Sequence, residues 1–163
     1  MIFIVMGVSG SGKTTVGKTV SSQFGWKFYE GDEYHPAKNM EKMKNGIPLN
    51  DKDRLPWLLC LKKIIEEALE NKENIIISCS ALKEAYRKIL KINNDVKFIY
   101  LKGSYDLVKK RMEERGSHFF KPAMLKSQLD DLEEPKDVIE IDISGSKDSV
   151  VKDVITKIKQ SEL

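Results

Sequence analysis

A glycine-rich segment near the N-terminus has the residue types needed to bind a phosphate chain. Residues 7–14 read GVSGSGKT, which satisfies the pattern G-x-x-x-x-G-K-[ST] at every fixed position. Glycines let backbone N–H groups turn toward an anion, the lysine reaches the β- and γ-phosphates, and the hydroxyl binds Mg²⁺. The motif therefore predicts a nucleotide site. Its predicted ligands are Gly7, Ser9, Gly10, Ser11, Gly12, Lys13, Thr14 and Thr15, with Lys13 also catalytic and Thr14 also a metal ligand.

The same loop occurs in regulatory GTPases, so the motif alone does not choose a reaction. A GTPase normally carries an N-K-x-D guanine motif late in its sequence, but residues 71–74 read NKEN and lie too early. The only D-x-x-G pattern, at 142–145, is far from the glycine-rich loop. We therefore favour a small-molecule kinase that uses ATP and Mg²⁺. A protein that binds nucleotide and partners without turnover is the non-enzymatic alternative.

A second set of polar residues follows the predicted strand 27–30. Asp32 lies just beyond it, and ligands of open α/β sheets gather beyond the carboxyl ends of the strands. We predict that Asp32 is catalytic and accepts the proton of an acceptor hydroxyl. The alternative places Asp32 in the Mg²⁺ shell, because Ser78-Cys79-Ser80 offers no aspartate after the third strand and phosphoryl transfer makes little demand on a base.

The elements that must position these residues alternate between short apolar runs and helical patterns, which is typical of βαβ units. The expected strands are 2–6, 27–30, 74–79, 96–102 and 138–143. The expected helices are 13–24, a short one within 32–53, one capped by Asp53, 81–90, one capped by Ser104, 122–132 and a C-terminal one. This pattern predicts an α/β, three-layer P-loop NTPase fold with a five-stranded parallel sheet and helices on both faces.

Length and composition agree with a single domain over residues 1–163. Chains of this size bury about 68–70% of their unfolded surface and need no disulfides or structural metal. No stretch approaches the roughly 18 apolar residues of a membrane span, and no signal peptide is recognisable. We expect Cys60 and Cys79 to be reduced and buried, and the protein to be cytoplasmic. The net charge of +3 gives no indication of a nucleic-acid partner.

Residues 31–58 carry a much more specific pattern, G-D-x-x-H-P-x-x-N-x-x-K-M-x-x-G-x-P-L-x-D-x-D-R-x-P-W-L. This pattern resembles the gluconate kinases of the shikimate-kinase-like branch of P-loop kinases. The resemblance continues through 79–87, 98–103 and 111–121 and covers nearly the whole chain. It implies transfer of the ATP γ-phosphoryl group to the 6-hydroxyl of D-gluconate, giving 6-phospho-D-gluconate and ADP. It also implies a homodimer.

Gluconate is an anion with many hydroxyls, so its site should combine guanidinium groups with short polar side chains. We predict an acceptor-binding region at 32–57. The predicted substrate ligands in and around it are Asp32, His35, Arg54, Ser80, Lys83 and Arg87. Each basic residue has a plainer interpretation as a solvated side chain.

A basic cluster late in the chain resembles the lid of this kinase group. We expect a lid at about 112–125, in which Arg111 is catalytic and contacts the nucleotide, while Arg115 and His118 contact substrate. The loop 142–149 is where adenine rests in relatives. Kinases of shikimate or of a nucleoside monophosphate are the enzyme alternatives. Shikimate is disfavoured because a glycine triplet would stand in place of Ser78-Cys79-Ser80, and the short lid disfavours many adenylate kinases.

Overall fold

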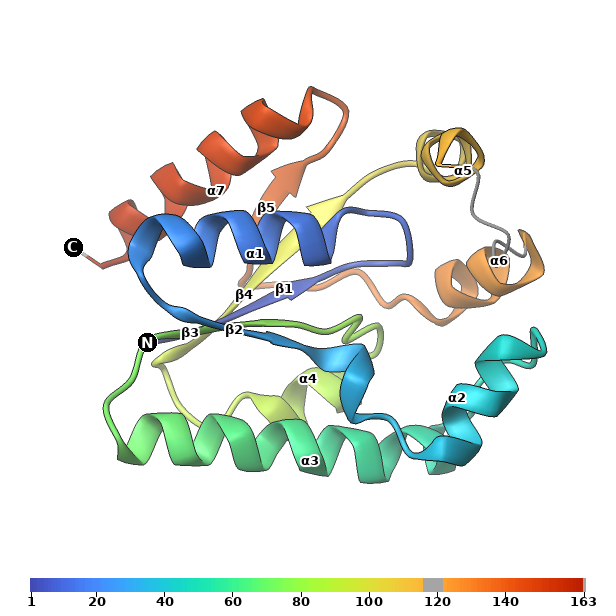
Figure 1. Cartoon of the computed structure of the whole chain (residues 1–163), viewed down its shortest axis with the longest axis horizontal. Coiled ribbons are helices and arrows are strands. Elements are labelled where there is room, and N and C mark those ends of the chain that lie inside the picture. The colour runs from blue at the N-terminus through green and yellow to red at the C-terminus, as the bar shows by residue number, and fades with distance from the viewer. Residues whose placement is uncertain (116–121, 163) are drawn as a thin grey trace.

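The computed structural model describes residues 1–115 and 122–162, and these form a five-stranded parallel sheet between two layers of helices (Figure 1). The strands are β1 (Ile2–Met6), β2 (Lys27–Glu30), β3 (Ile75–Ser78), β4 (Val96–Lys102) and β5 (Ile139–Asp142). Their order across the sheet is β2-β3-β1-β4-β5, and every neighbouring pair is parallel. The predicted fold class is confirmed, and each strand ends within one residue of its predicted position.

Helices cover both faces of this sheet. One layer contains α1 (Lys13–Phe24) and α7 (Lys147–Ser161), and the other contains α3 (Asp51–Glu70) and α4 (Glu84–Leu90). Three further helices, α2 (Ala37–Lys44), α5 (Tyr105–Glu114) and α6 (Pro122–Asp131), lie beyond the carboxyl ends of the strands, and the 3₁₀ turn Gly31–Tyr34 follows β2 directly (Figure 1). Elements far apart in sequence therefore meet at one edge of the sheet, where ligands of this architecture bind.

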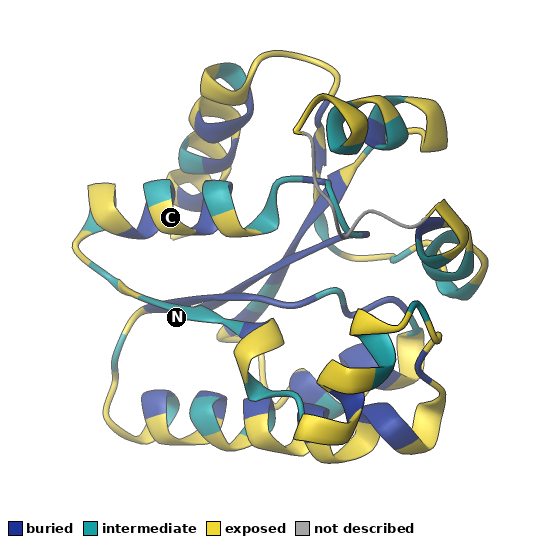
Figure 2. Ribbon diagram, turned by 45° about the vertical axis from the view of Figure 1, so that its right-hand side comes forward, coloured by how far each residue is buried: buried dark blue, intermediate teal, exposed yellow. Residues whose placement is uncertain are grey.

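Two hydrophobic cores result from the alternation of side chains along buried strands. In β1, Ile2, Ile4 and Met6 pack under α3 and α4, whereas Phe3 and Val5 pack under α1 and α7. Figure 2 shows the central strands buried and the helices exposed on their outer sides. Because both faces of the sheet are covered, its inner strands are apolar at nearly every position, and polar residues at their ends stand out.

Local details differ from the sequence-based expectations at three places. Asn50, not Asp53, caps α3, and the two residues form a reciprocal capping box that starts the helix three residues earlier. Ala81 has a φ of 45°, so the backbone cannot be helical there and α4 begins only at Glu84. The expected burial of Cys60 is wrong: it lies exposed on the outer side of α3, while Cys79 is buried.

The predicted lid at about 112–125 is described only in part. Residues 112–114 form the end of α5, Arg115 is its C-cap residue, and 122–125 form the start of α6, which packs against α5. Residues 116–121, which include His118, lie outside the described part of the chain. Within the described residues, no helix is both long and apolar enough to cross a membrane.

Candidate functional site

The glycine-rich loop joins β1 to α1 and leaves the first backbone N–H groups of α1 available. Gly12 occupies the N-cap position in the left-handed region, with a φ of 97°, and no side chain caps the helix. The unpaired N–H groups and the helix dipole both favour an anion at this point. The hydroxyl of Ser11 is buried beside them without a hydrogen-bond partner in the described structure. These features fit a bound phosphate group.

Lys13 occupies the centre of the site. Its ammonium group donates to the carbonyl oxygen of Val8 at 3.0 Å. Burial lowers the pKa of Lys13, and the nearby carboxylates of Asp32 and Glu30 oppose that shift. A half-buried cation with few partners is well suited to receive the negative charge of a phosphate chain.

Glu30 connects the loop to the neighbouring strand. The Thr14 hydroxyl donates to one Glu30 carboxylate oxygen, and the Ser78 hydroxyl donates to the other at 2.5 Å. Glu30 was not among the predicted site residues, although its position at the end of β2, two residues before Asp32, is the signal that could have identified it. The structure thus gathers two carboxylates and a hydroxyl around Lys13.

The donor set at this point fits Mg²⁺. Magnesium is usually held by one or two carboxylates together with water and phosphate oxygens, rather than by a complete protein cage. Thr14 with Asp32 or Glu30 matches that requirement, and the part of the chain that is described holds no cluster of three metal-binding side chains. Thr14 and Asp32 lie in a concavity at the glycine-rich loop, here called the loop cleft. It is lined by Ser9, Gly10, Gly12, Lys13, Thr14, Thr15, Asp32 and Arg115.

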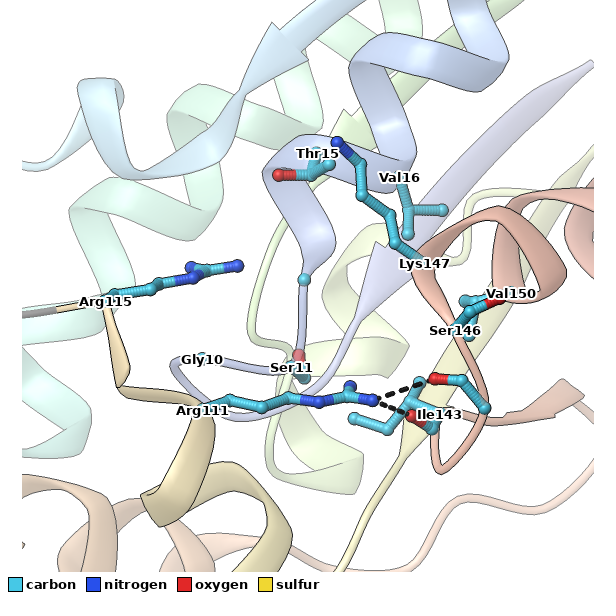
Figure 3. A pocket seen from close by; sticks show the side chains of 12 residues that line it. Gly10, Ser11, Thr15, Val16, Arg111, Arg115, Ile143, Ser146, Lys147 and Val150 are labelled. Atoms are coloured by element: carbon cyan, nitrogen blue, oxygen red, sulfur yellow. Dashed lines mark hydrogen bonds between the residues drawn. The ribbon is translucent and has the colours of Figure 1, made fainter. Parts of the chain in front are cut away.

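Pocket A lies on one side of the loop cleft, between the glycine-rich loop and the start of α7 (Figure 3). It is lined by Gly10, Ser11, Gly12, Thr15, Val16, Arg111, Arg115, Ile143, Gly145, Ser146, Lys147 and Val150. One Nη of Arg111 donates to the carbonyl oxygens of Ile143 and of Gly145, the latter at 3.0 Å. Arg111 therefore joins α5 to the loop at 142–149, and Arg115 extends from the end of the same helix across the glycine-rich loop (Figure 3).

Pocket B lies on the other side of the loop cleft, under α6 and beside the start of α3. It is lined by Ser9, Lys13, Asp32, His35, Met43, Pro48, Leu49, Arg54, Trp57, Ser80, Leu82, Met124, Ser127 and Gln128. The predicted residues Asp32, His35, Arg54 and Ser80 meet here, although they come from distant parts of the sequence.

Arg54 is the guanidinium group of pocket B. It is buried, and one Nη donates to the Tyr86 hydroxyl and to Asp131, each at 3.0 Å. Burial lowers the pKa of Arg54, but Tyr86 and Asp131 outweigh this effect and raise it, so the side chain stays charged. Its Nε and second Nη donate to no described residue, which leaves three N–H donors for a ligand.

His35 lies against the indole ring of Trp57, with ring centroids 4.1 Å apart. Its Nδ1 is 3.2 Å from the amide nitrogen of Asn39. Burial lowers the pKa of His35, and the positive charge of Arg54 adds to the effect while Asp32 opposes it. The imidazole in pocket B is therefore neutral at neutral pH.

Gln128 is a site residue that the sequence alone did not indicate. Its Oε1 accepts from the backbone N–H of Ser9 at 2.7 Å, and its Nε2 donates to the Ser9 hydroxyl at 2.9 Å. No motif marks it, because it lies on an ordinary amphipathic helix 119 residues from its partner. Through these two bonds α6 is attached to the glycine-rich loop.

Arg87 and Lys83 are not brought into pocket B. All five N–H groups of Arg87 are used, since they donate to Glu84 and to three backbone carbonyl oxygens, those of Ala81, Leu82 and Glu133. Lys83 pairs with Asp51 at 2.9 Å. We therefore leave both residues out of the site, and Arg111 and Arg115 belong with pocket A and the loop cleft.

The loop cleft adjoins pockets A and B. It shares Gly10, Gly12, Thr15 and Arg115 with pocket A. It shares Ser9, Lys13 and Asp32 with pocket B. The three concavities therefore form one continuous row with the phosphate-binding loop at its centre. The strand order, the loop and this row of pockets define a P-loop kinase.

Comparison with known proteins agrees with this class and narrows it. A family model described as shikimate kinase matches residues 9–159. The chain is 42% identical to the thermoresistant gluconokinase of Escherichia coli (strain K12), over 99% of this chain and 95% of that protein. It is 46% identical to the thermosensitive gluconokinase of the same strain, over 87% and 79%.

A solved structure gives the same result. The crystal structure of a gluconokinase from Sinorhizobium meliloti 1021 superposes with a TM-score of 0.89 at 37% identity, covering 97% of this chain and 91% of that one. The chain therefore belongs to the shikimate kinase family, on the branch that contains the gluconokinases. The resemblance predicted from residues 31–58 is confirmed.

Proposed function

We propose that this protein is an ATP-dependent gluconokinase, which transfers the γ-phosphoryl group of ATP to the 6-hydroxyl of D-gluconate. The observation that carries the proposal is the sharing of Ser9, Lys13 and Asp32 between the loop cleft and pocket B. A phosphate chain on the loop would then end where an acceptor in pocket B begins. The similarity to gluconokinases supports the identity of that acceptor.

The free donors of Arg54 suit the carboxylate end of a sugar acid. A guanidinium group binds a carboxylate through two parallel hydrogen bonds, and Nε with the free Nη form such a pair. His35 and Ser80 add polar groups for hydroxyls, while Trp57 provides an apolar wall. With its carboxylate on Arg54, gluconate would extend toward Asp32 and Lys13 and present its far hydroxyl to the loop cleft.

In the proposed reaction the 6-oxygen forms a bond to the γ-phosphorus as the bond from that phosphorus to the β–γ bridging oxygen breaks, so that ADP leaves. Asp32 orients the hydroxyl and takes its proton late, because the transition state is loose and needs little base strength. Lys13, Arg111 and Arg115 offset the charge on the phosphates. Mg²⁺ held by Thr14 with Asp32 or Glu30 would neutralise the β- and γ-oxygens.

The test is ADP release from Mg-ATP with D-gluconate, related sugar acids, shikimate and AMP as acceptors. The highest kcat/KM is expected for gluconate, and EDTA should abolish the reaction. A preference for shikimate or AMP would overturn the substrate assignment, and release independent of any acceptor would overturn the kinase assignment. The implied homodimer stays a prediction, which light scattering on the purified protein can check.

A further inference from the structure

The side-chain amide of Asn39 has an orientation that its surroundings determine. Asn39 is fully buried on α2, and its Nδ2 donates to the backbone carbonyl oxygen of Asp53 at 2.7 Å. A carbonyl oxygen only accepts hydrogen bonds, so the amide atom facing it must be the nitrogen. The same nitrogen lies 3.2 Å from Nδ1 of His35. Both contacts of the amide with its neighbours are thus made by its N–H groups.

This orientation determines where the proton of His35 lies. Since the Asn39 nitrogen can only donate, Nδ1 of His35 must be the acceptor and cannot carry a proton itself. A neutral imidazole then carries its proton on Nε2. Among the described residues nothing accepts a hydrogen bond from Nε2, while His35 forms part of the lining of pocket B. The stacked ring of Trp57 fixes the plane of the imidazole.

We propose that Asn39 is a positioning residue that holds His35 as the Nε2–H tautomer, so that Nε2–H donates a hydrogen bond to an oxygen of the bound acceptor. The identity of that oxygen as belonging to a sugar acid rests on the proposed function, but the tautomer does not. One consequence concerns catalysis. An Nε2–H group cannot take the proton of a hydroxyl, so His35 is excluded as the base and Asp32 remains the proton acceptor.

The unpaired oxygen of Asn39 agrees with a role beyond stability. Its Oδ1 is buried without a hydrogen-bond partner among the described residues. Leaving a buried acceptor unpaired costs stability, and each such group in a folded protein calls for an explanation. Here the explanation is that both donors of the amide are committed, one to the start of α3 and one to His35, and the oxygen is left over.

The direct test is nitrogen-15 NMR of the imidazole rings in the intact protein at neutral pH. The sequence holds only two histidines, and His35→Gln identifies the His35 signals by removing them. Long-range proton–nitrogen correlations report which ring nitrogen carries the proton. The inference expects a protonated Nε2 and an unprotonated Nδ1 for His35. A protonated Nδ1 in the wild-type protein would overturn it without reference to any enzymatic activity.

Substitution of Asn39 gives the second test. In Asn39→Asp a carboxylate faces Nδ1, which favours a proton on Nδ1, so the signals of His35 should move to the other tautomer or to the imidazolium. Asn45→Asp is the matched control, because it adds the same charge at the exposed end of α2, outside pocket B. An unchanged His35 tautomer in folded Asn39→Asp would contradict the role of Asn39.

Steady-state kinetics of His35 and Asn39 variants then shows whether Asn39 positions His35 for the substrate or only stabilises the fold. Gln carries its amide nitrogen near the place of Nε2 and Asn near the place of Nδ1, so His35→Gln should keep more kcat/KM for the sugar acid than His35→Asn. If Asn39→Asp gives the Nδ1–H tautomer, it should lower kcat/KM by about 10- to 100-fold, the worth of a hydrogen bond to a charged ligand. If it gives the imidazolium, which keeps Nε2–H, kcat/KM should fall much less. Equal losses in His35→Gln and His35→Asn would overturn the donor role. If gluconate leaves the His35 signals unmoved, the proposed acceptor is wrong although the tautomer is settled.

Discussion

Pockets A and B lie on opposite sides of the same loop but are built differently. Pocket A and the loop cleft depend on backbone: glycine conformations, the open N-terminus of α1 and two carbonyl oxygens held by Arg111. Pocket B depends on side chains from distant segments, such as Arg54 with Asp131, 77 residues apart. A short motif can encode the first kind of site, whereas the second exists only after the chain has folded.

The largest effect is expected from Lys13→Ala. Loss of a preorganised cation at a developing charge should lower kcat by at least about 10²- to 10³-fold. Lys13 is half-buried and its ammonium group makes a single hydrogen bond, to Val8, so its removal should not lower the melting temperature. Lys18→Ala on the exposed side of α1 is the control and should behave like wild type. Near-normal turnover in Lys13→Ala would refute the assignment of the phosphate-binding loop.

Two buried arginines provide the next test, since they differ in how many donors they keep for a ligand. Arg54→Ala should raise the KM for gluconate by about 10- to 100-fold while the KM for ATP stays nearly constant. Arg87→Ala removes the donor from the carbonyl oxygens of Ala81 and Glu133, while the Leu82 carbonyl still accepts from the N–H of Glu133. Leaving a buried acceptor unpaired costs about 1–3 kcal/mol, so this variant should lower stability instead.

The measurements for this pair are steady-state kinetics and urea unfolding of both variants. A selective rise in the gluconate KM of folded Arg87→Ala, with Arg54→Ala unchanged, would place the carboxylate elsewhere.

A smaller effect on kcat/KM is expected from loss of the contact between Gln128 on α6 and Ser9 of the glycine-rich loop. Gln128→Ala removes both bonds to Ser9 and should lower kcat/KM by about 5- to 30-fold, since one hydrogen bond is usually worth about 1 kcal/mol. A double-mutant cycle with Ser9→Ala should give a coupling of about 1 kcal/mol. Lys126→Ala, exposed on the same helix, is the control. Strict additivity would mean that the contact does not act in the reaction.

The smallest effect on turnover is expected from alkylation of the two cysteines. Burial raises the pKa of the Cys79 thiol to about 12, so almost no thiolate forms there at pH 8, and the exposed Cys60 should react alone with iodoacetamide. Alkylation should leave turnover unchanged, because Cys60 lies on the outer side of α3. Mass spectrometry of the folded protein and of Cys60→Ser checks this, and rapid labelling of Cys79 would contradict the packing described for β3.

The fold and the family followed from the sequence because their signals are local. Apolar runs of β1 and β4 and the capping serine of α5 placed these elements at their observed bounds. The site was only partly predictable. Arg54 and Arg87 look alike in sequence, and only the folded chain shows that all donors of Arg87 are used. Gln128 has no pattern to mark it. The assigned roles of the site residues stay predictions until these variants are measured.

Phosphate binding alone does not explain why position 10 must be glycine. A Cβ at this position would lie 2.5 Å from the Cγ of Met112 and 3.1 Å from a methyl group of Val108, both on α5. An added methyl group would therefore push away the helix that carries Arg111 and Arg115. Gly10 therefore has no side chain for two independent reasons. An anion must approach its backbone closely on one side, and α5 must pack against it on the other. Met112→Ala removes only the clash with α5. The double variant Gly10→Ala with Met112→Ala should therefore restore the position of α5 without restoring nucleotide affinity.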